Sequence, residues 1–364
     1  MMKSNKLYSL ILLVIAVAFS LSLNAQECEW KDGVVSDSFI FDPGYIPSVH
    51  ASTIAETPSG LVVAFFGGQY EGAPDVGIYV SKSNKEGWTK PVKVAEGTMD
   101  GDRRKACYNP VLFRYPDGEL ILFYKIGKNV QDWKGYLIRS VDYGQTWSQP
   151  ETLPDGFLGP IKNKPELIGD KLICPSSTED NGWQVHFEFT EDRGKTWRKT
   201  EPVNSKPWNI IQPSIIKLKN GDLQVICRSQ DEHLISSFSS DEGETWSDPV
   251  SLYVPNNNSG TDAVTLSDGR HLLIYNHVKA KQSAYVDKAR TPLNLAVSDD
   301  GITWRASAIL EDSSIGEYSY PSIIQGDDGS VHIVYTWRRK NIRYVKVDPF
   351  KLIAKPFVNG KWPE

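Results

Sequence analysis

A short turn motif recurs along the sequence, and this repeat constrains the fold more than any other feature. The pattern S/T-x-D-x-G-x-T-W occurs at residues 140–147, 190–197 and 239–246, and a version one residue shorter occupies residues 298–304. A degenerate copy at residues 81–88 keeps only the first residue and the tryptophan. The tryptophans are therefore spaced by about 50–60 residues, which indicates an array of similar modules.

A second repeat marks the strands of each module. Glycine turns recur at residues 60, 118, 169, 221, 269 and 329, and each precedes a run of apolar, β-branched and aromatic residues. Such a run after a glycine turn is typical of the second strand of a hairpin. A third strand precedes each tryptophan turn and a short fourth segment follows it. Because no segment of helical periodicity stands out after the N-terminus, the pattern predicts an all-β fold.

Six modules of four strands predict a six-bladed β-propeller with the aspartate-containing turns at its rim. The sixth module lacks a tryptophan turn and a fourth strand, whereas a spare strand is expected at Asp37–Asp42. We expect this N-terminal strand to complete the last blade, because an open ring would leave an unpaired sheet edge. A β-sandwich built from the same hairpins is the alternative architecture.

The first 25 residues have the pattern of a secretory signal peptide. Lys3 and Lys6 precede a long apolar run, and small and polar residues follow up to Ala25. We therefore expect a secreted or periplasmic protein, with residues 26–364 forming one propeller domain that is a monomer. After this segment no apolar stretch is long enough to span a membrane.

Composition and cysteine content limit the partners and cofactors. With 40 basic and 45 acidic residues the net charge is -5, which argues against nucleic acid but allows an anionic ligand held by clustered arginines. The four cysteines (Cys28, Cys107, Cys174 and Cys227) permit disulfides in an exported chain, with three possible pairings. No metal motif, dinucleotide fingerprint or loop that requires calcium is found, so no metal or cofactor is expected.

The glycine repeat also locates a candidate site. In a propeller the first strand of each blade lines the central channel, so equivalent residues before the glycine turns gather at one end of it. Six polar residues occupy such places in blades one to six: His50, Asn109, Lys164, Gln212, Asp262 and Tyr320. Each could simply cap a strand, but six of them on converging strands favour a pocket for a polar ligand.

With these turns on a six-bladed frame, the chain resembles the sialidase superfamily of Asp-box (BNR) repeat proteins over essentially all of the mature sequence. The resemblance implies a tyrosine nucleophile, arginines that clamp a sugar carboxylate, and an acid in an early loop. Tyr320 in YPSIIQGDDG matches the tyrosine, and Arg228 in GDLQVICRS and Arg290 in ARTPLNLAVS match two of the arginines. Glu71 and Asp75 in GGQYEGAPDVG are the candidates for the acid.

Two positions depart from the family's pattern. The first clamp arginine should fall near His50, where the sequence reads YIP, and the glutamate that activates the tyrosine is replaced by Gln212. Glu317, three residues before Tyr320, is a candidate substitute for that base. Because a tyrosine is a weak nucleophile until a neighbour takes its proton, these departures weaken the case for sialic acid itself.

The favoured function is an exo-acting glycosidase that removes a terminal, acidic or neutral, sugar from glycans or polysaccharides. Tyr320 would serve as nucleophile or proton relay, and Glu71 or Asp75 as the general acid. Arg228 and Arg290 would clamp an anionic group of that sugar.

Two other functions use the same residues. A polysaccharide lyase would remove the C5 proton of a uronic acid with His50 and Tyr320 as base and acid, while Gln212, Asn109 and Arg228 hold the carboxylate. A glycan-binding propeller without catalysis would use tryptophans outside the repeated turns as sugar platforms, namely Trp133, Trp183, Trp208 and Trp337.

Overall fold

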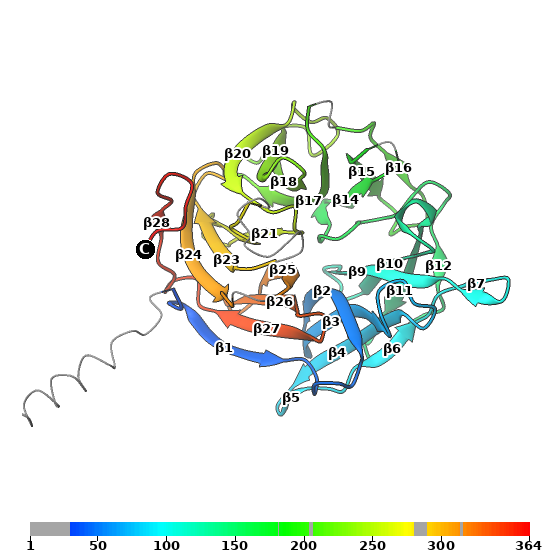
Figure 1. Cartoon of the computed structure of the whole chain (residues 1–364). Coiled ribbons are helices and arrows are strands. Elements are labelled where there is room, and N and C mark those ends of the chain that lie inside the picture. The colour runs from blue at the N-terminus through cyan, green and yellow to red at the C-terminus, as the bar shows by residue number, and fades with distance from the viewer. Residues whose placement is uncertain (1–29, 181, 204–206, 280–289, 314–315) are drawn as a thin grey trace, which may run out of the picture.

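The computed structural model describes residues 30–180, 182–203, 207–279, 290–313 and 316–364. Its strands form six sheets in a ring around a central channel, which confirms the predicted all-β, six-bladed propeller (Figure 1). One three-residue 3-10 turn, Val130–Asp132, interrupts the strands. The described residues include no helix long and apolar enough to cross a membrane. The expected signal peptide and Cys28 lie outside these residues.

Blades one to three follow the chain from the innermost strand outward. Blade one contains β2 (Ser48–Thr57), β3 (Gly60–Gly68), β4 (Gly77–Asn84), β5 (Gly87–Trp88) and β6 (Val92–Ala95). A small hairpin of β7 (Met99–Asp100) and β8 (Arg103–Arg104) leads to blade two, with β9 (Ala106–Arg114), β10 (Leu120–Gly127), β11 (Lys134–Ser140) and β12 (Glu151–Thr152). Blade three contains β13 (Glu166–Ile168), β14 (Lys171–Thr178), β15 (Gln184–Thr190) and β16 (Arg198–Lys199).

Blades four to six complete the ring. Blade four contains β17 (Ile210–Lys217), β18 (Leu223–Ser229), β19 (His233–Ser239) and β20 (Val250–Pro255). Blade five contains β21 (Asp262–Thr265), β22 (His271–Tyr275), β23 (Leu293–Ser298) and β24 (Trp304–Glu311), and β28 (Lys355–Pro356) is added at its outer edge. Blade six contains β25 (Tyr318–Gln325), β26 (Val331–Trp337) and β27 (Asn341–Val347).

The fourth strand of blade six comes from the N-terminal part of the chain. β1 (Val34–Phe39) pairs antiparallel with β27, three residues earlier than the segment expected from the sequence. In Figure 1 the blue β1 lies along the outer side of the red β27. An ion pair between Asp37 and Arg343, 2.6 Å long, links the two strands. This pairing covers the sheet edge that blade six would otherwise expose.

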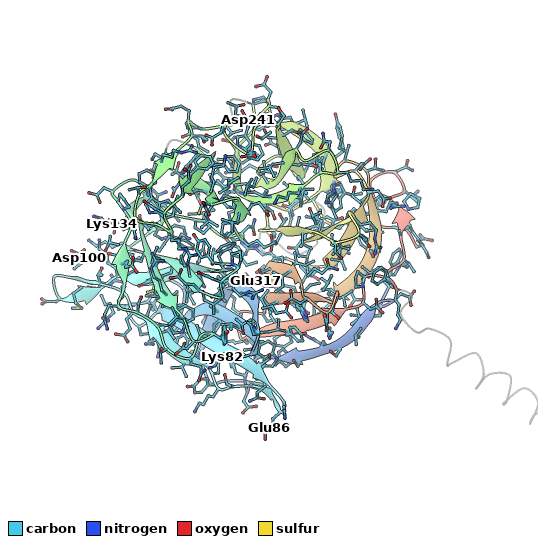
Figure 2. All side chains as sticks on the ribbon, turned by 180° about the vertical axis from the view of Figure 1, so that it is seen from behind. Lys82, Glu86, Asp100, Lys134, Asp241 and Glu317 are labelled. Atoms are coloured by element: carbon cyan, nitrogen blue, oxygen red, sulfur yellow. The ribbon has the colours of Figure 1, made fainter. Side chains whose placement is uncertain are left out.

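The repeated turns are structural features of the rim. In the turn at residues 239–246, the Asp241 carboxylate accepts a hydrogen bond from the Thr245 N–H (2.9 Å), and the Trp246 indole N–H donates to the Gly243 carbonyl (2.9 Å). The Trp246 ring stacks on Phe187 of blade three, with ring centres 4.1 Å apart. Figure 2 shows Asp241 at the outer edge and Glu317 near the centre, so this turn lies away from the channel.

Three of the four cysteines lie within the described residues. Cys107 in β9, Cys174 in β14 and Cys227 in β18 are buried free thiols in three different blades. None of the disulfides among these three that the sequence permitted is therefore present. Apolar packing between neighbouring blades stabilises the ring instead.

Candidate active site

The innermost strands of four blades are interrupted at the same level by a β-bulge. The residue at each bulge has a positive φ: Ala51 (54°), Asn109 (39°), Gln212 (56°) and Tyr320 (50°). In three blades a proline follows, which cannot donate to the strand ladder and therefore favours a bulge. Bulges redirect side chains, and left-handed backbone at non-glycine residues is typical of functional sites. The structure thus places three of the predicted residues, in blades two, four and six, at equivalent positions.

Tyr320 belongs to a closed triangle of hydrogen bonds at the end of the channel. Arg228 Nη1 donates to the Tyr320 hydroxyl and to Gln212 Oε1, at 3.1 Å each. Since arginine only donates, the Gln212 amide nitrogen must face the tyrosine, and it donates to the same hydroxyl at 3.1 Å. The Tyr320 oxygen therefore accepts two hydrogen bonds, and the residue at the expected place of a base is a donor.

His50 packs directly on Tyr320. It lies one residue before the bulge position of blade one, which Ala51 occupies, and its ring centre is 4.2 Å from that of Tyr320. Its Nδ1 is 3.0 Å from the Thr336 hydroxyl of blade six. Burial holds the pKa of His50 well below its usual value, so the imidazole is neutral at physiological pH.

Positive charges that surround His50 lower its pKa further. They belong, in order of effect, to Arg339, Arg290, Arg228 and Lys162. The Arg290 guanidinium is 5.4 Å and that of Arg228 is 6.0 Å from the centre of the Tyr320 ring. The two arginines matched from the sequence therefore converge on the tyrosine, and a third arginine joins them.

This third arginine, Arg339, was not predicted from the sequence. It lies in the turn between β26 and β27, where both Arg338 (51°) and Arg339 (56°) have positive φ. The Arg339 carbonyl accepts from the Val49 N–H (3.0 Å), which ties the turn to blade one beside His50. Two consecutive non-glycine residues in left-handed conformation are uncommon, and backbone strain of this kind is typical of functional sites.

Two carboxylates partner these arginines. Glu317 Oε1 binds Arg339 Nε at 2.8 Å and Arg290 Nη1 at 3.4 Å. Glu71, from the loop after β3, binds the other side of Arg339. Glu317 therefore bridges two arginines, whereas the described partners of the Tyr320 hydroxyl are Arg228 and Gln212, so Glu317 does not stand where a substitute base would. Of the two candidate acids, Glu71 reaches this cluster.

Asp75, the other candidate acid, is engaged in its own loop. Both of its carboxylate oxygens accept from the Gln69 N–H, at 3.2 and 3.0 Å. It shapes the loop that carries Glu71, and its hydrogen bonds among the described residues are to Gln69 and Lys93 rather than to the arginine cluster.

Lys164 and Asp262 form an ion pair with each other. Their charged groups are 3.0 Å apart, and Asp262 is fully buried. The Asp262 carboxylate also accepts from the Ser214 hydroxyl (2.7 Å) of blade four and the Ile323 N–H (2.9 Å) of blade six. The pair thus joins blades three to six as a buried polar link, and neither residue touches Tyr320.

The loops that lead into blades three and five bring Lys162 and Gly260 to the centre. A Cβ on Gly260 would lie 3.1 Å from Gln212 Oε1 and 3.4 Å from Tyr320 Cδ2, so the absence of a side chain lets these two residues meet. Gly260 stands nine residues before the turn glycine Gly269, and the same count gives Ala51 in blade one. Counting nine residues back from every turn glycine would have located Ala51 and Gly260. Neither residue has a polar side chain, so the search for polar residues passed over them.

One tryptophan outside the repeated turns reaches the site. The Arg228 guanidinium lies 5.0 Å from the centre of the Trp183 ring, a cation–π contact. Trp133 packs on Tyr108 and Trp337 on Phe39, with ring centres 5.1 Å apart in each pair. Trp208 packs in the core of blades three and four.

The fold and this geometry define a class: a six-bladed β-propeller with an arginine-rich site around a tyrosine at one end of its channel. Over the described ranges no group of three or more histidine, cysteine, aspartate or glutamate side chains could hold a metal ion. The family model of the BNR repeat-like domain matches residues 59–333, and the chain belongs to this family.

The chain is also similar in sequence to sialidases. A sialidase of Paraclostridium sordellii is 26% identical over 356 residues, which cover 84% of each protein. The anhydrosialidase of Macrobdella decora is 23% identical over 248 residues, 61% of this chain but only 32% of that protein. The chain thus spans about a third of that relative. These similarities confirm the resemblance to the sialidase superfamily.

The fold is also similar to that of a sialidase of known structure. The Hadza microbial sialidase Hz136 superposes with a TM-score of 0.72 at 18% identity, covering 87% of this chain and 69% of that one. At this identity the match demonstrates the shared propeller.

Proposed function

We propose that the protein is an exported glycan-active enzyme that cleaves a terminal acidic sugar from glycans or polysaccharides. The observation that carries this proposal is the convergence of Arg228, Arg290 and Arg339 around Tyr320. The three arginines outnumber the two carboxylates beside them, in a protein whose net charge is -5. Such a local excess of positive charge attracts and orients an anionic ligand. The similarity to sialidases supports a sugar acid as that ligand.

In the hydrolase, Tyr320 is the reacting group. Arg228 and Gln212 both donate to its oxygen, so negative charge that develops there during the reaction is stabilised. Guanidinium groups have five N–H donors each, so Arg290 and Arg339 keep donors for a substrate carboxylate while they bind Glu317.

Glu71 is the proton donor in this proposal. In the structure its carboxylate binds Arg339. A substrate carboxylate that binds Arg339 in its place releases Glu71, which then transfers a proton taken from water to the leaving oxygen.

A polysaccharide lyase is the second candidate, and the His50–Tyr320 contact favours it. His50 is neutral and its ring centre is 4.2 Å from that of Tyr320, whereas the partners of the tyrosine hydroxyl among the described residues are Arg228 and Gln212, not a carboxylate. In a β-elimination His50 would take the C5 proton of a uronic acid held by the arginines, and Tyr320 would give its proton to the leaving oxygen. The products would be an unsaturated uronate and a free hydroxyl.

A glycan screen separates these functions. The purified protein would be incubated with sialylated glycans, glucuronides and uronate-rich polysaccharides, and new reducing ends and ultraviolet absorbance would be followed together. We expect new reducing ends without an absorbance increase. An absorbance increase would instead establish the lyase, and binding without either signal would establish a non-catalytic glycan-binding propeller.

Arg339→Gln tests the third arginine. We expect the variant to bind a sugar carboxylate about 10–100-fold more weakly, because a charge-assisted hydrogen bond contributes about 1.5–3 kcal/mol. Calorimetric titration with N-acetylneuraminic acid and with glucuronic acid measures the change.

Arg338→Gln is the matched control for this experiment. Arg338 has the same left-handed backbone but donates to the Tyr318 hydroxyl at 3.2 and 3.1 Å, away from the cluster. The affinity of the Arg338→Gln variant for both sugar acids should equal that of the unmodified protein. Equal losses in both variants would show that the turn matters only for its conformation and that Arg339 does not bind the anion.

A further inference from the structure

Lys162 spans the channel beneath Tyr320. Lys162 lies in the loop between blades two and three and is 4% exposed. Its ammonium group donates to the carbonyl oxygens of Thr261 (2.8 Å) in blade five and of Pro321 in blade six, and to Asn163 Oδ1 (2.8 Å). All three of its N–H donors are thus used, and two of them hold backbone in other blades.

Asn163 reaches a third blade. It is 1% exposed, and its side-chain nitrogen donates to the carbonyl oxygens of Gln212 (3.0 Å) and Pro213 (3.1 Å) in blade four. Since Lys162 can only donate to Oδ1, the orientation of the Asn163 amide is determined by its neighbour.

Three of the four carbonyl groups held by these two residues belong to the strained bulges of blades four and six. Pro321 follows Tyr320, and Asn163 binds the Gln212 carbonyl itself. A left-handed conformation at a non-glycine residue costs free energy and persists only where its surroundings enforce it. Blades four and six, which provide Gln212 and Tyr320, are separated by blade five, and the contacts of Lys162 and Asn163 link them directly across the channel.

We propose that Lys162 and Asn163 form a cross-channel brace that positions Tyr320 and Gln212 for the hydrogen-bonded triangle with Arg228. The brace consists of these two side chains and the four carbonyl groups that they hold in blades four, five and six. The importance of the brace for turnover rests on the proposed role of Tyr320 as the reacting group. Its effect on the positions of Tyr320 and Gln212 is independent of that role.

The chemistry of Lys162 agrees with a positioning role. Burial lowers the pKa of Lys162 to about 7, because an ammonium group in the interior loses its hydration. An apolar side chain would fill the same space without that cost. A buried lysine here is therefore better explained by the carbonyl groups that it orients than by packing.

Lys125 offers a matched control. It is also fully buried, and burial lowers its pKa to about 7 as well. It donates to the carbonyl oxygens of Asn109 (3.3 Å) and Pro160, in blade two and the following loop, and does not contact the strand of Tyr320. Lys125→Met therefore removes a buried lysine of the same kind but leaves the brace intact.

The experiment compares Lys162→Met and Lys125→Met in the full chain, by crystal structures and by turnover of the substrate identified in the glycan screen. In the Lys162→Met structure we expect at least one of the two 3.1 Å hydrogen bonds to the Tyr320 hydroxyl to exceed 3.5 Å. We expect kcat to fall by about 10²-fold, with a smaller change in KM, because misplacement of about 1 Å has effects of this size. In Lys125→Met the triangle and kcat should be retained at a similar loss of thermal stability.

A triangle that stays intact in Lys162→Met, or an equal loss of kcat in Lys125→Met, would overturn the brace. If no glycan is turned over, the proposed function fails while the crystal structures still decide the geometry. Should Lys162→Met not fold, Asn163→Asp keeps the Lys162 contact but turns a carboxylate oxygen toward the Gln212 carbonyl. Displacement of Gln212 from Tyr320 in that structure is expected, and an unmoved Gln212 would contradict the proposal.

Discussion

Replacing Tyr320 by phenylalanine is expected to lower kcat/KM by about 10²–10⁴-fold on the substrate identified in the glycan screen, the usual range for a group that transfers a proton in the transition state. The variant loses only the hydroxyl that accepts from Arg228 and Gln212, while the ring contact with His50 at 4.2 Å remains possible. Binding of the sugar acid should change much less, because the arginines stay in place. Steady-state kinetics and calorimetric titration measure the two effects separately.

Tyr318→Phe is the control for that variant. Tyr318 lies two residues earlier on the same strand and is buried, and its hydroxyl accepts from Arg338 outside the arginine cluster. Its loss should lower stability without a comparable loss of kcat. Full activity of Tyr320→Phe on every cleaved glycan would show that Tyr320 is neither nucleophile nor proton relay.

Asp262→Ala is expected to destabilise the protein by about 3–5 kcal/mol, the usual effect of removing one partner from a buried ion pair. The fully buried carboxylate binds Lys164 at 3.0 Å and accepts from the Ser214 hydroxyl and the Ile323 N–H. Its removal leaves these donors, which come from three other blades, without their acceptor. Denaturant unfolding monitored by tryptophan fluorescence measures the change in the free energy of unfolding.

Asp248→Ala provides the comparison, because Asp248 is exposed and its replacement should change the free energy of unfolding by no more than about 0.5 kcal/mol. The sequence predicted Asp262 as a substrate-binding residue. If that role holds, Asp262→Ala will instead weaken sugar binding and leave stability close to that of Asp248→Ala.

The architecture could be predicted because short local sequence patterns specify its turns and strands. Each turn with an aspartate, a glycine and a tryptophan makes its hydrogen bonds within a few residues, as the contact between Asp241 and Thr245 shows. Each glycine turn likewise specifies a hairpin through neighbouring residues only. Periodic local signals of this kind number the blades without knowledge of any contact between them.

Residues of the site were predictable where they share the repeat. Asn109, Gln212 and Tyr320 are each followed by proline at a constant distance from a glycine turn, and the structure places all three at equivalent bulges. The same spacing did not predict that Lys164 and Asp262 form an ion pair with each other, because a position in the repeat does not tell which side chains meet across blades.

Arg339 and the Lys162–Asn163 brace follow no repeat at all. Arg339 comes from a turn between the second and third strands of blade six, and the brace comes from a loop between blades. Their partners lie far away along the chain, as with Lys162 and Pro321, which are 159 residues apart. Only the closed ring brings them together, since contacts across the channel depend on how six blades pack and not on any local pattern.

Local hydrogen bonding and hydrophobic alternation are thus enough to specify the strands, the turns, the number of blades and the tyrosine at the channel. The tertiary structure alone decides which charged side chains surround that tyrosine. These side chains are arginines from blades four, five and six and the carboxylates Glu71 and Glu317, which meet only after the propeller has closed. Electrostatic interactions act through space, so a site built from them is decided by the distances between blades.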